Sequence, residues 1–204
     1  DERISFVSNP IHSGAAAARN RALQKARGEY IAVLDSDDLW DENHLQILIS
    51  KLQLHPSANL ISSGIRLIDD SGMILGRTRL PARFFPRLSL CVRNDRPHSA
   101  SIFRRQAAID LGGYPESLLI GEDYSLWISL AALELPITVS KVTASYRRHP
   151  SQATSTPLSK GDSFRLFEQR LALARVASVA SVVVRLSYYF ETIRATRRKT
   201  RWAA

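Results

Sequence analysis

The chain has 204 residues, of which 45% are hydrophobic and 23% are charged, with only nine glycines and nine prolines. This composition is typical of a globular domain and excludes a disordered or collagen-like chain. The single cysteine, Cys91, excludes an internal disulfide and a multi-thiolate metal site, and it favours a cytoplasmic location. The longest candidate for an apolar span, Val176 to Val184, falls well short of the roughly 20 residues that cross a membrane.

Twenty-eight Lys and Arg residues against nineteen Asp and Glu residues give a formal net charge of +9. A charge of this sign suits anionic partners such as nucleic acid, a phosphorylated metabolite or an anionic membrane surface. No nucleic-acid-binding motif accompanies it, so we expect no specific nucleic-acid partner. The basic C-terminal tail could give a peripheral membrane contact, and a solvated tail is the alternative. The basic residues of the tail are Arg194, Arg197, Arg198, Lys199 and Arg201.

The first part of the chain shows the order of elements that is typical of an α/β protein. Residues 13–27 predict a helix, with Gly28 placed for a left-handed C-terminal cap. The apolar run at 30–34 predicts a short strand that is buried on both faces, as in a parallel sheet. Asp41 is a candidate cap for the following helix, which we expect to end near His55. The apolar positions of that helix share one face: Leu45, Leu48, Ile49 and Leu52.

Beyond this helix the pattern predicts a strand at 59–68 and a hairpin partner at 73–75. Residues 77–97 combine three prolines with several arginines and the pair Phe84-Phe85, which predicts a long, partly irregular connection of a kind that is often functional. The elements predicted after it are a strand at 99–103, a short helix at 106–111, a helix that begins at 122, a strand at 137–146 and a long amphipathic helix from 163 to about 193.

An acidic segment, Asp35-Ser36-Asp37-Asp38, directly follows the predicted strand at 30–34. The carboxyl ends of strands are where open α/β sheets place their ligand sites. Carboxylates two residues apart in a loop can face one hard divalent cation, which would bridge the oxygens of a diphosphate and neutralise a leaving group. The alternative is a solvated turn that caps the next helix.

A second acidic pair, Glu122-Asp123, begins a predicted helix and follows the turn Gly112-Gly113-Tyr114. Glycines in such a turn let the backbone approach a ligand closely. A carboxylate on the first turn of a helix could act as a general base that takes the proton from an attacking hydroxyl. The alternative role is to stabilise the helix dipole.

A series of spaced motifs runs along the chain: Asn9, Ser13-Gly14, Ala18-Arg19-Asn20, Ala26 to Ile31, Leu34 to Trp40, Gly112-Gly113-Tyr114 and Glu122 to Trp127. In type and order they resemble the motifs of the family 2 glycosyltransferases of GT-A fold. The resemblance extends from Arg3 to about His149. It implies a GT-A-like (Rossmann-like) α/β fold with a mixed, mainly parallel sheet and flanking helices. The C-terminal helical extension lies outside the resemblance and is predicted from the residues themselves.

The same resemblance implies an enzyme, a glycosyltransferase that moves a sugar from a nucleotide-diphosphate donor to an acceptor hydroxyl. It implies metal-dependent, inverting displacement with Mn²⁺ or Mg²⁺ as cofactor, in cell-envelope polysaccharide or glycoconjugate synthesis. The expected acceptor is a saccharide, a lipid-linked sugar or a protein, and the expected location is the cytoplasm or the membrane periphery. The alternative is a non-catalytic remnant or partner-binding domain of the same fold.

The resemblance also assigns roles to the acidic residues. Asp35 and Asp37 correspond to the family's DxD-type motif, with Asp37 as the closer metal ligand and Asp35 nearer to the donor ribose. Asp38 is an expected helper in donor binding. Asp123 corresponds to the catalytic base.

Five further residues receive expected roles from the resemblance. Arg19 and Gly113 belong to the donor side, and Glu122 and Trp127 belong to the acceptor side. His149 is an expected contact of the diphosphate or the metal. The alternatives are a helix surface charge for Arg19, a core aromatic for Trp127 and a structural role for His149.

The chain departs from the family pattern at its start. Members normally begin with a strand, a helix and a second strand whose acidic end holds the nucleobase, and this sequence starts after that unit. We therefore expect an N-terminally truncated glycosyltransferase-like domain at 1–150, followed by a linker, an amphipathic helix and the basic tail at 151–204.

Overall fold

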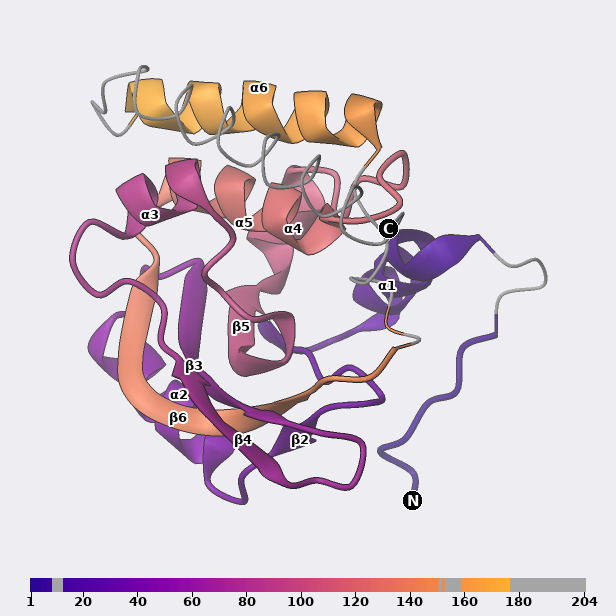
Figure 1. Cartoon of the computed structure of the whole chain (residues 1–204). Coiled ribbons are helices and arrows are strands. Elements are labelled where there is room, and N and C mark those ends of the chain that lie inside the picture. Colours follow the sequence, from indigo (N-terminus) through magenta and orange to yellow (C-terminus); the bar gives the residue numbers. More distant parts are fainter. Residues whose placement is uncertain (9–12, 151, 153–158, 177–204) are drawn as a thin grey trace, which may run out of the picture.

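The computed structural model describes residues 1–8, 13–150, 152 and 159–176 (Figure 1). The helices are α1 (Gly14–Lys25), α2 (His44–Leu54), α3 (Pro86–Val92), α4 (Arg105–Asp110), α5 (Glu122–Leu133) and α6 (Lys160–Val176), with a 3-10 turn η1 (His98–Ala100). The strands are β1 (Tyr30–Ala32), β2 (Leu39–Trp40), β3 (Leu60–Ile68), β4 (Ile74–Arg79), β5 (Ser101–Arg104) and β6 (Ile137–Arg147). Among the described residues, none of the helices has the length and apolarity needed to cross a membrane.

The strands form one six-stranded sheet in the order β1-β5-β3-β6-β2, with β4 also paired to β3. Along one edge of β3, β5 pairs with residues 60–62 and β4 pairs with residues 65–68. β6 runs parallel to β3, whereas the other four pairings are antiparallel. The mixed sheet with flanking helices confirms the predicted α/β class, but the prediction of a mainly parallel sheet is wrong.

The error arises from the apolar run at 30–34. Only its first three residues form β1, which pairs antiparallel to β5 with Tyr30 opposite Arg104, and Leu34 is 46% exposed. An apolar run indicates burial, but it does not encode the direction of the neighbouring strand. Direction depends on the connections, and a tight hairpin such as β3–β4 returns the chain antiparallel.

Alternate residues of the central strands face two separate layers. Leu60 of β3 and Phe103 of β5 belong to the large core cluster that also contains the buried side of α5. Their neighbours Ile61 and Ile102 belong to a second cluster with Leu48 of α2. Because side chains alternate along a strand, α5 and α2 cover opposite faces of the sheet.

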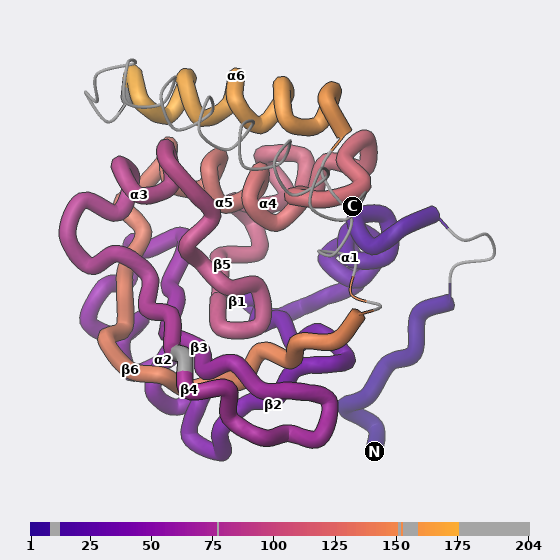
Figure 2. Tube along the Cα trace, viewed as in Figure 1, coloured from indigo at the N-terminus to yellow at the C-terminus, as the bar shows by residue number. Residues whose placement is uncertain are grey.

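Helix α6 lies on the outer side of the layer formed by α3, α4 and α5 (Figures 1 and 2). Its Leu166 and Leu173 are buried in the same core cluster as α5, and Arg170 Nε donates a 2.6 Å hydrogen bond to the Cys91 carbonyl on α3. The described part of the predicted C-terminal helix is therefore packed on the domain. The rest of that predicted helix and the basic tail lie outside the described residues, and the division of the chain at residue 150 stays a prediction.

Two predicted helix caps are wrong. Helix α1 ends in an extended C-cap, Ala26 (φ −62°, ψ 144°), so Gly28 is not a left-handed cap. Helix α2 begins at His44, and Asp41 instead accepts hydrogen bonds of 2.9 and 2.6 Å from the Arg66 guanidinium. Asp41 is fixed at the end of β2, where its backbone N donates to the Thr143 carbonyl.

The region 77–97 is more ordered than its composition predicts. Strand β4 extends to Arg79, and α3 occupies seven residues after a short connection. Phe85, the N-cap of α3, has a φ of 55° and a ψ of 53°, and it is the single non-glycine residue with positive φ in the described part of the chain.

Candidate active site

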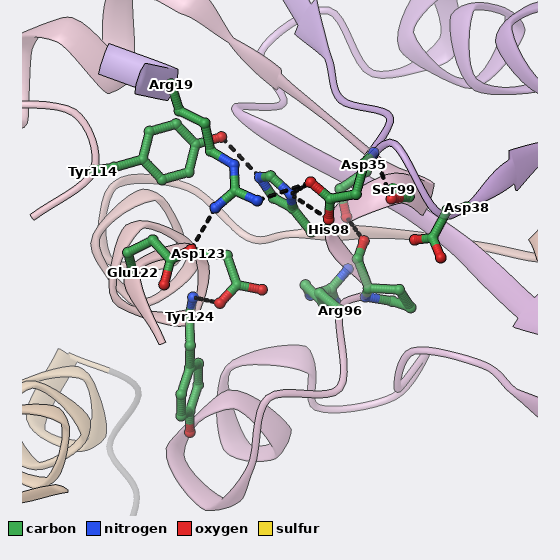
Figure 3. Close-up of polar contacts among 12 residues, drawn as sticks. Arg19, Asp35, Asp38, Arg96, His98, Ser99, Tyr114, Glu122, Asp123 and Tyr124 are labelled. Carbon is green, nitrogen blue, oxygen red and sulfur yellow. Dashed lines mark hydrogen bonds and ion pairs between the residues drawn. The ribbon is translucent and has the colours of Figure 1, made fainter. Parts of the chain in front are cut away.

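The two predicted acidic segments, far apart in the sequence, meet around one arginine (Figure 3). Arg19 of α1 donates a 2.8 Å hydrogen bond from Nη2 to Asp35 Oδ1, and its Nη1 donates to Glu122 Oε1 at the start of α5. The side chains of Arg19, Asp35 and Glu122 are 24%, 30% and 13% exposed. Arg19 is therefore a bridging residue of a partly buried cluster and not a solvated helix charge.

A histidine on the turn η1 fixes the other side of Asp35. His98 Nδ1 lies 3.3 and 3.2 Å from the two Asp35 carboxylate oxygens, and His98 Nε2 lies 3.0 Å from the Tyr114 hydroxyl. Burial raises the pKa of the Asp35 carboxyl, but His98 and Arg19 lower it by more, so this pKa lies well below its ordinary value. Burial raises the pKa of the Tyr114 hydroxyl. The site thus pairs an ionised carboxylate with a neutral phenol.

Asp37 and Asp38 face the end of β6 and the residues that follow it. His149 Nε2 lies 3.1 Å from Asp37 Oδ2, while Arg147 donates from Nε to the Asp37 carbonyl and from its backbone N to Asp38 Oδ1, at 2.9 and 3.0 Å. Asp38 is 5% exposed, and burial raises its pKa to about 6 although hydrogen bonds from Ser99 and Arg147 lower it. Asp38 therefore ties the acidic segment to β6, and Asp37 keeps the more accessible carboxylate.

Asp123 lies on the first turn of α5, beside the N-cap Gly121 with its φ of 87°. Its Oδ1 accepts a 2.6 Å hydrogen bond from the Tyr124 backbone N, and its Oδ2 accepts a 3.2 Å hydrogen bond from Asn94 Nδ2. The residue is only partly buried. A substrate group can therefore approach a carboxylate whose orientation is already fixed.

Gly113 is required by the packing of α1 against the turn that follows α4. Its φ is 74°, and a Cβ at this position would clash with Asn20 Oδ1. Asn20 holds the turn by accepting a 2.7 Å hydrogen bond from the Tyr114 backbone N and donating a 2.8 Å hydrogen bond to the Tyr114 carbonyl. These contacts give Gly113 a structural role, and its expected contact with the donor stays a prediction.

The two predicted acceptor-side residues, Trp127 and Glu122, lie in different surroundings. Trp127 is 0% exposed, its Nε1 donates a 3.2 Å hydrogen bond to the Arg96 carbonyl, and its ring centroid lies 5.8 Å from that of His98. A fully buried side chain cannot touch an acceptor, so Trp127 has the alternative role of a core aromatic. Glu122 accepts a hydrogen bond from Arg19, and its expected acceptor-side role stays a prediction.

The predicted metal contacts Asp37 and His149 lie together, with His149 Nε2 3.1 Å from Asp37 Oδ2. Within the described ranges, no three or more His, Cys, Asp or Glu side chains are grouped so that they could hold a metal ion. Asp35 is already occupied by Arg19 and His98. A carboxylate suits Mn²⁺ or Mg²⁺, and an imidazole is a common metal ligand, so the Asp37–His149 pair fits a cation whose other ligands come from a bound substrate.

His98 and Asn94 are site residues that the sequence does not reveal. Asn94 lies in the region 77–97 that is expected to be partly irregular, and His98 directly follows that region. The pairing of β1 with β5 places Ala32 opposite Ile102, and continuing this register brings the residues before β5 beside Asp35, whose backbone N donates to Ser99 Oγ at 3.1 Å. A recognised β1–β5 pairing is the signal that could have located His98.

Sequence comparison identifies relatives among glycosyltransferases. The profile of glycosyl transferase family 2 matches residues 1–112. The UDP-Glc:alpha-D-GlcNAc-diphosphoundecaprenol beta-1,3-glucosyltransferase WfgD of Escherichia coli is 30% identical over 130 residues, which are 64% of this chain and 49% of that protein. The chain spans about half the length of the curated relatives it matches.

Solved structures share the fold. TarS residues 1–349 of S. aureus, in complex with UDP-GlcNAc, match with a TM-score of 0.62 at 18% identity, covering 86% of this chain and 51% of that one. The mannosyltransferase PcManGT of Pyrobaculum calidifontis, in complex with GDP-Man and Mn²⁺, matches with a TM-score of 0.56 at 15% identity, covering 97% of this chain and 65% of that one. The fold is thus of GT-A type. Because the family profile matches more than half of this chain, the chain belongs to glycosyl transferase family 2.

Proposed function

We propose that this chain binds a nucleotide-diphosphate sugar and transfers the sugar to an acceptor hydroxyl with inversion at the anomeric carbon. The observation that carries the proposal is the bridge in which Arg19 contacts both Asp35 and Glu122. This bridge brings a candidate donor-binding segment next to a candidate base, Asp123. Family membership supports the proposal, as does the fold shared with a structure that contains UDP-GlcNAc.

The donor would lie along the acidic segment that follows β1. Asp35 is ionised and held by Arg19 and His98, so its carboxylate has a fixed position from which it could accept hydrogen bonds from ribose hydroxyls. Asp37 and His149 would hold Mn²⁺ or Mg²⁺ together with diphosphate oxygens. When bound, the cation would neutralise the negative charge that develops on the diphosphate leaving group.

Asp123 would act on the acceptor. The acceptor oxygen forms a bond to the anomeric carbon while the bond from that carbon to the diphosphate oxygen breaks, and the bonding electrons leave with the nucleoside diphosphate. The acceptor proton passes to the Asp123 carboxylate, a transfer that typically contributes about 10² to 10⁴ in rate. Asn94 and the Tyr124 backbone N would orient the carboxylate for this step. A single displacement of this kind inverts the anomeric configuration.

We further propose that the acceptor is a saccharide of cell-envelope synthesis, such as a lipid-linked sugar. The support for this class is the 30% identical WfgD, whose name specifies a GlcNAc-diphosphoundecaprenol acceptor. The half-buried position of Asp123 suits a bulky acceptor, because the carboxylate can be approached from the surface.

A non-catalytic domain that keeps this fold is the second candidate. It is favoured by the engagement of Asp35 with Arg19 and His98, which leaves Asp37 and His149 as the remaining metal-ligand pair in the described part of the site. Such a domain would use the same surface to bind a partner.

Product formation by the 204-residue chain tests the proposal. The chain is incubated with UDP- and GDP-sugars, Mn²⁺ and either free or lipid-linked saccharides, and both the nucleoside diphosphate and the glycosylated product are measured. We expect Asp123→Asn to lower kcat by about 10² to 10⁴. The control is Asp110→Asn, which changes an exposed carboxylate on α4 that accepts a hydrogen bond from Gln106. A folded wild-type chain that forms no product with any pair would favour the non-catalytic domain.

A further inference from the structure

The segment 71–94, which includes β4, α3 and the connection between them, carries a surface feature that the proposed transferase site does not use. Residues 71–94 contain five arginines and no Asp or Glu. Within this region, residues 79–85, here called the Phe-Phe loop, read Arg-Leu-Pro-Ala-Arg-Phe-Phe. The loop therefore concentrates positive charge and large apolar side chains in one short segment.

The apolar side chains of the Phe-Phe loop are exposed. Phe84 and Phe85 are each 76% exposed, and Leu80 is 50% exposed. Arg79 and Arg83 are exposed too, and the Arg83 guanidinium carbon lies 5.7 Å from the centroid of the Phe84 ring. Single exposed apolar residues are common on proteins, whereas a contiguous apolar patch with a polar rim marks an interaction site.

The Phe-Phe loop is held in place by its middle residues. The Ala82 backbone N donates a 2.8 Å hydrogen bond to Asp95 Oδ2, and the Ala82 carbonyl accepts a 2.7 Å hydrogen bond from Thr138 Oγ1. Pro81 is buried. Phe85 keeps a left-handed backbone conformation that a bulky residue rarely adopts. The two phenylalanines are thus presented at the surface by a fixed backbone.

We propose that the Phe-Phe loop docks the protein on an anionic lipid bilayer. Phe84 and Phe85 would enter the interfacial region of the bilayer, where aromatic side chains are favoured, while Arg79 and Arg83 would bind lipid phosphates. Charge complementarity selects this occupant, because the segment carries arginines and no carboxylates of its own. The nearby Asp95 carboxylate faces inward, where it accepts hydrogen bonds from Ala82 and Ser89. The proposal does not depend on the transferase activity.

Vesicle flotation with the full chain tests this docking. Vesicles of phosphatidylcholine alone are compared with vesicles of equal parts phosphatidylcholine and phosphatidylglycerol. We expect the wild-type chain to float with the anionic vesicles, to bind the neutral vesicles much more weakly, and to lose binding as NaCl concentration rises. The C-terminal tail is kept in every variant, so differences between variants report on the loop.

Two double variants separate the charge from the apolar contact. Arg79→Gln with Arg83→Gln should weaken partitioning about thirtyfold, because each basic residue near an anionic surface contributes about fivefold. Phe84→Ser with Phe85→Asn should weaken it on the order of a hundredfold, and Asn tolerates the left-handed backbone at position 85. The matched control, Lys25→Gln with Arg27→Gln, removes the same charge from exposed positions at the end of α1 and the turn after it, and should change binding less than threefold.

The proposal would be overturned if the wild-type chain does not float with anionic vesicles, or if the loop variants bind these vesicles as well as wild type does. It would also be overturned if the wild-type chain is a dimer that binds no vesicles and that Phe84→Ser with Phe85→Asn converts to a monomer. Circular dichroism and thermal melting establish that each variant is folded. The arginine variant changes only exposed side chains, so it should fold. If the phenylalanine variant does not fold, the arginine variant alone still tests whether the Phe-Phe loop binds the vesicles.

Discussion

Asp35 and Glu122 accept hydrogen bonds from one guanidinium, that of Arg19 (Figure 3). The first carboxylate follows β1 and the second begins α5, so the arginine fixes the distance between two segments that the sheet alone does not connect. Because these side chains are partly shielded from solvent, removing the arginine would leave two carboxylates without their cation, which costs more than breaking an exposed ion pair.

Replacing the bridging arginine should loosen both acidic segments. We expect Arg19→Gln to lower the free energy of unfolding by about 1–2 kcal/mol, because two partly buried carboxylates lose their cation. Urea denaturation measures the change. The control Arg27→Gln alters an exposed residue and should stay within about 0.5 kcal/mol of wild type. Equal stabilities of the two variants would contradict the assigned bridge.

The adjacent glycines Gly112 and Gly113 offer a matched pair for the turn after α4. Both have positive φ, of 85° and 74°, but a Cβ at Gly112 would meet open space whereas one at Gly113 would clash with Asn20. We expect Gly112→Ala to cost about 1 kcal/mol and Gly113→Ala at least about 2 kcal/mol. Thermal and urea unfolding of both variants measures the difference. A smaller cost at Gly113 would mean that Asn20 does not pack as described.

The buried carboxyl of Asp38 should make stability depend on pH. Its pKa is raised from 3.8 to about 6, so the folded state favours the protonated form; the stabilisation is complete below pH 4 and is lost as pH rises through about 6. Asp38→Asn keeps an acceptor for the Arg147 backbone N and removes the charge. We expect it to be more stable than wild type by about 1–3 kcal/mol at pH 8 and nearly equal at pH 4. Urea unfolding at the two pH values checks this, and a pH-independent difference would contradict the raised pKa.

Local patterns predicted much of the fold. The helix α2, the hairpin β3–β4 and the glycine turn after α4 follow from sequence spacing, because each depends on neighbouring residues. The predicted apolar face of α2 is only partly right, because Leu48 and Leu52 are buried whereas Leu45 and Ile49 are 40% and 49% exposed. The directions of the strands do not follow from local sequence spacing. β1 was expected in a parallel sheet, and its antiparallel pairing with β5 is a long-range property that an apolar run does not encode.

The candidate site was predictable only where a motif marks it. Asp35, Asp37, Glu122 and Asp123 were identified from their acidic segments, and the structure brings Asp35 and Glu122 together on Arg19. His98 was missed because its contact with Asp35 arises from the β1–β5 register. Trp127 was assigned to the acceptor side, whereas the 3.6-residue periodicity of α5 turns it into the core.

The reactivity of the Cys91 thiol should measure how firmly α6 packs on α3. Cys91 is fully buried, burial raises its pKa to about 11, and the Arg170 guanidinium holds the Cys91 and Val92 carbonyls at 2.6 and 2.7 Å. We expect a thiol reagent such as Ellman's reagent to react very slowly with the native chain. Arg170→Met should speed labelling about tenfold or more, because it frees α6 to open locally. The exposed Arg175→Met on the same helix is the control, and similar rates for both variants would contradict the anchoring role of Arg170.

The most direct test of the central claim, that the acidic segment after β1 binds a nucleotide diphosphate through a metal ion, is calorimetric titration of the 204-residue chain. UDP and GDP are titrated with and without Mn²⁺, into wild type, Asp37→Asn and the control Asp70→Asn, which changes an exposed carboxylate of the β3–β4 turn. The account predicts binding that requires Mn²⁺, is weakened at least about tenfold by Asp37→Asn and is unchanged by Asp70→Asn. Two results would contradict the central claim: nucleotide binding that is unchanged both without Mn²⁺ and in Asp37→Asn, or no nucleotide binding by a folded wild-type chain.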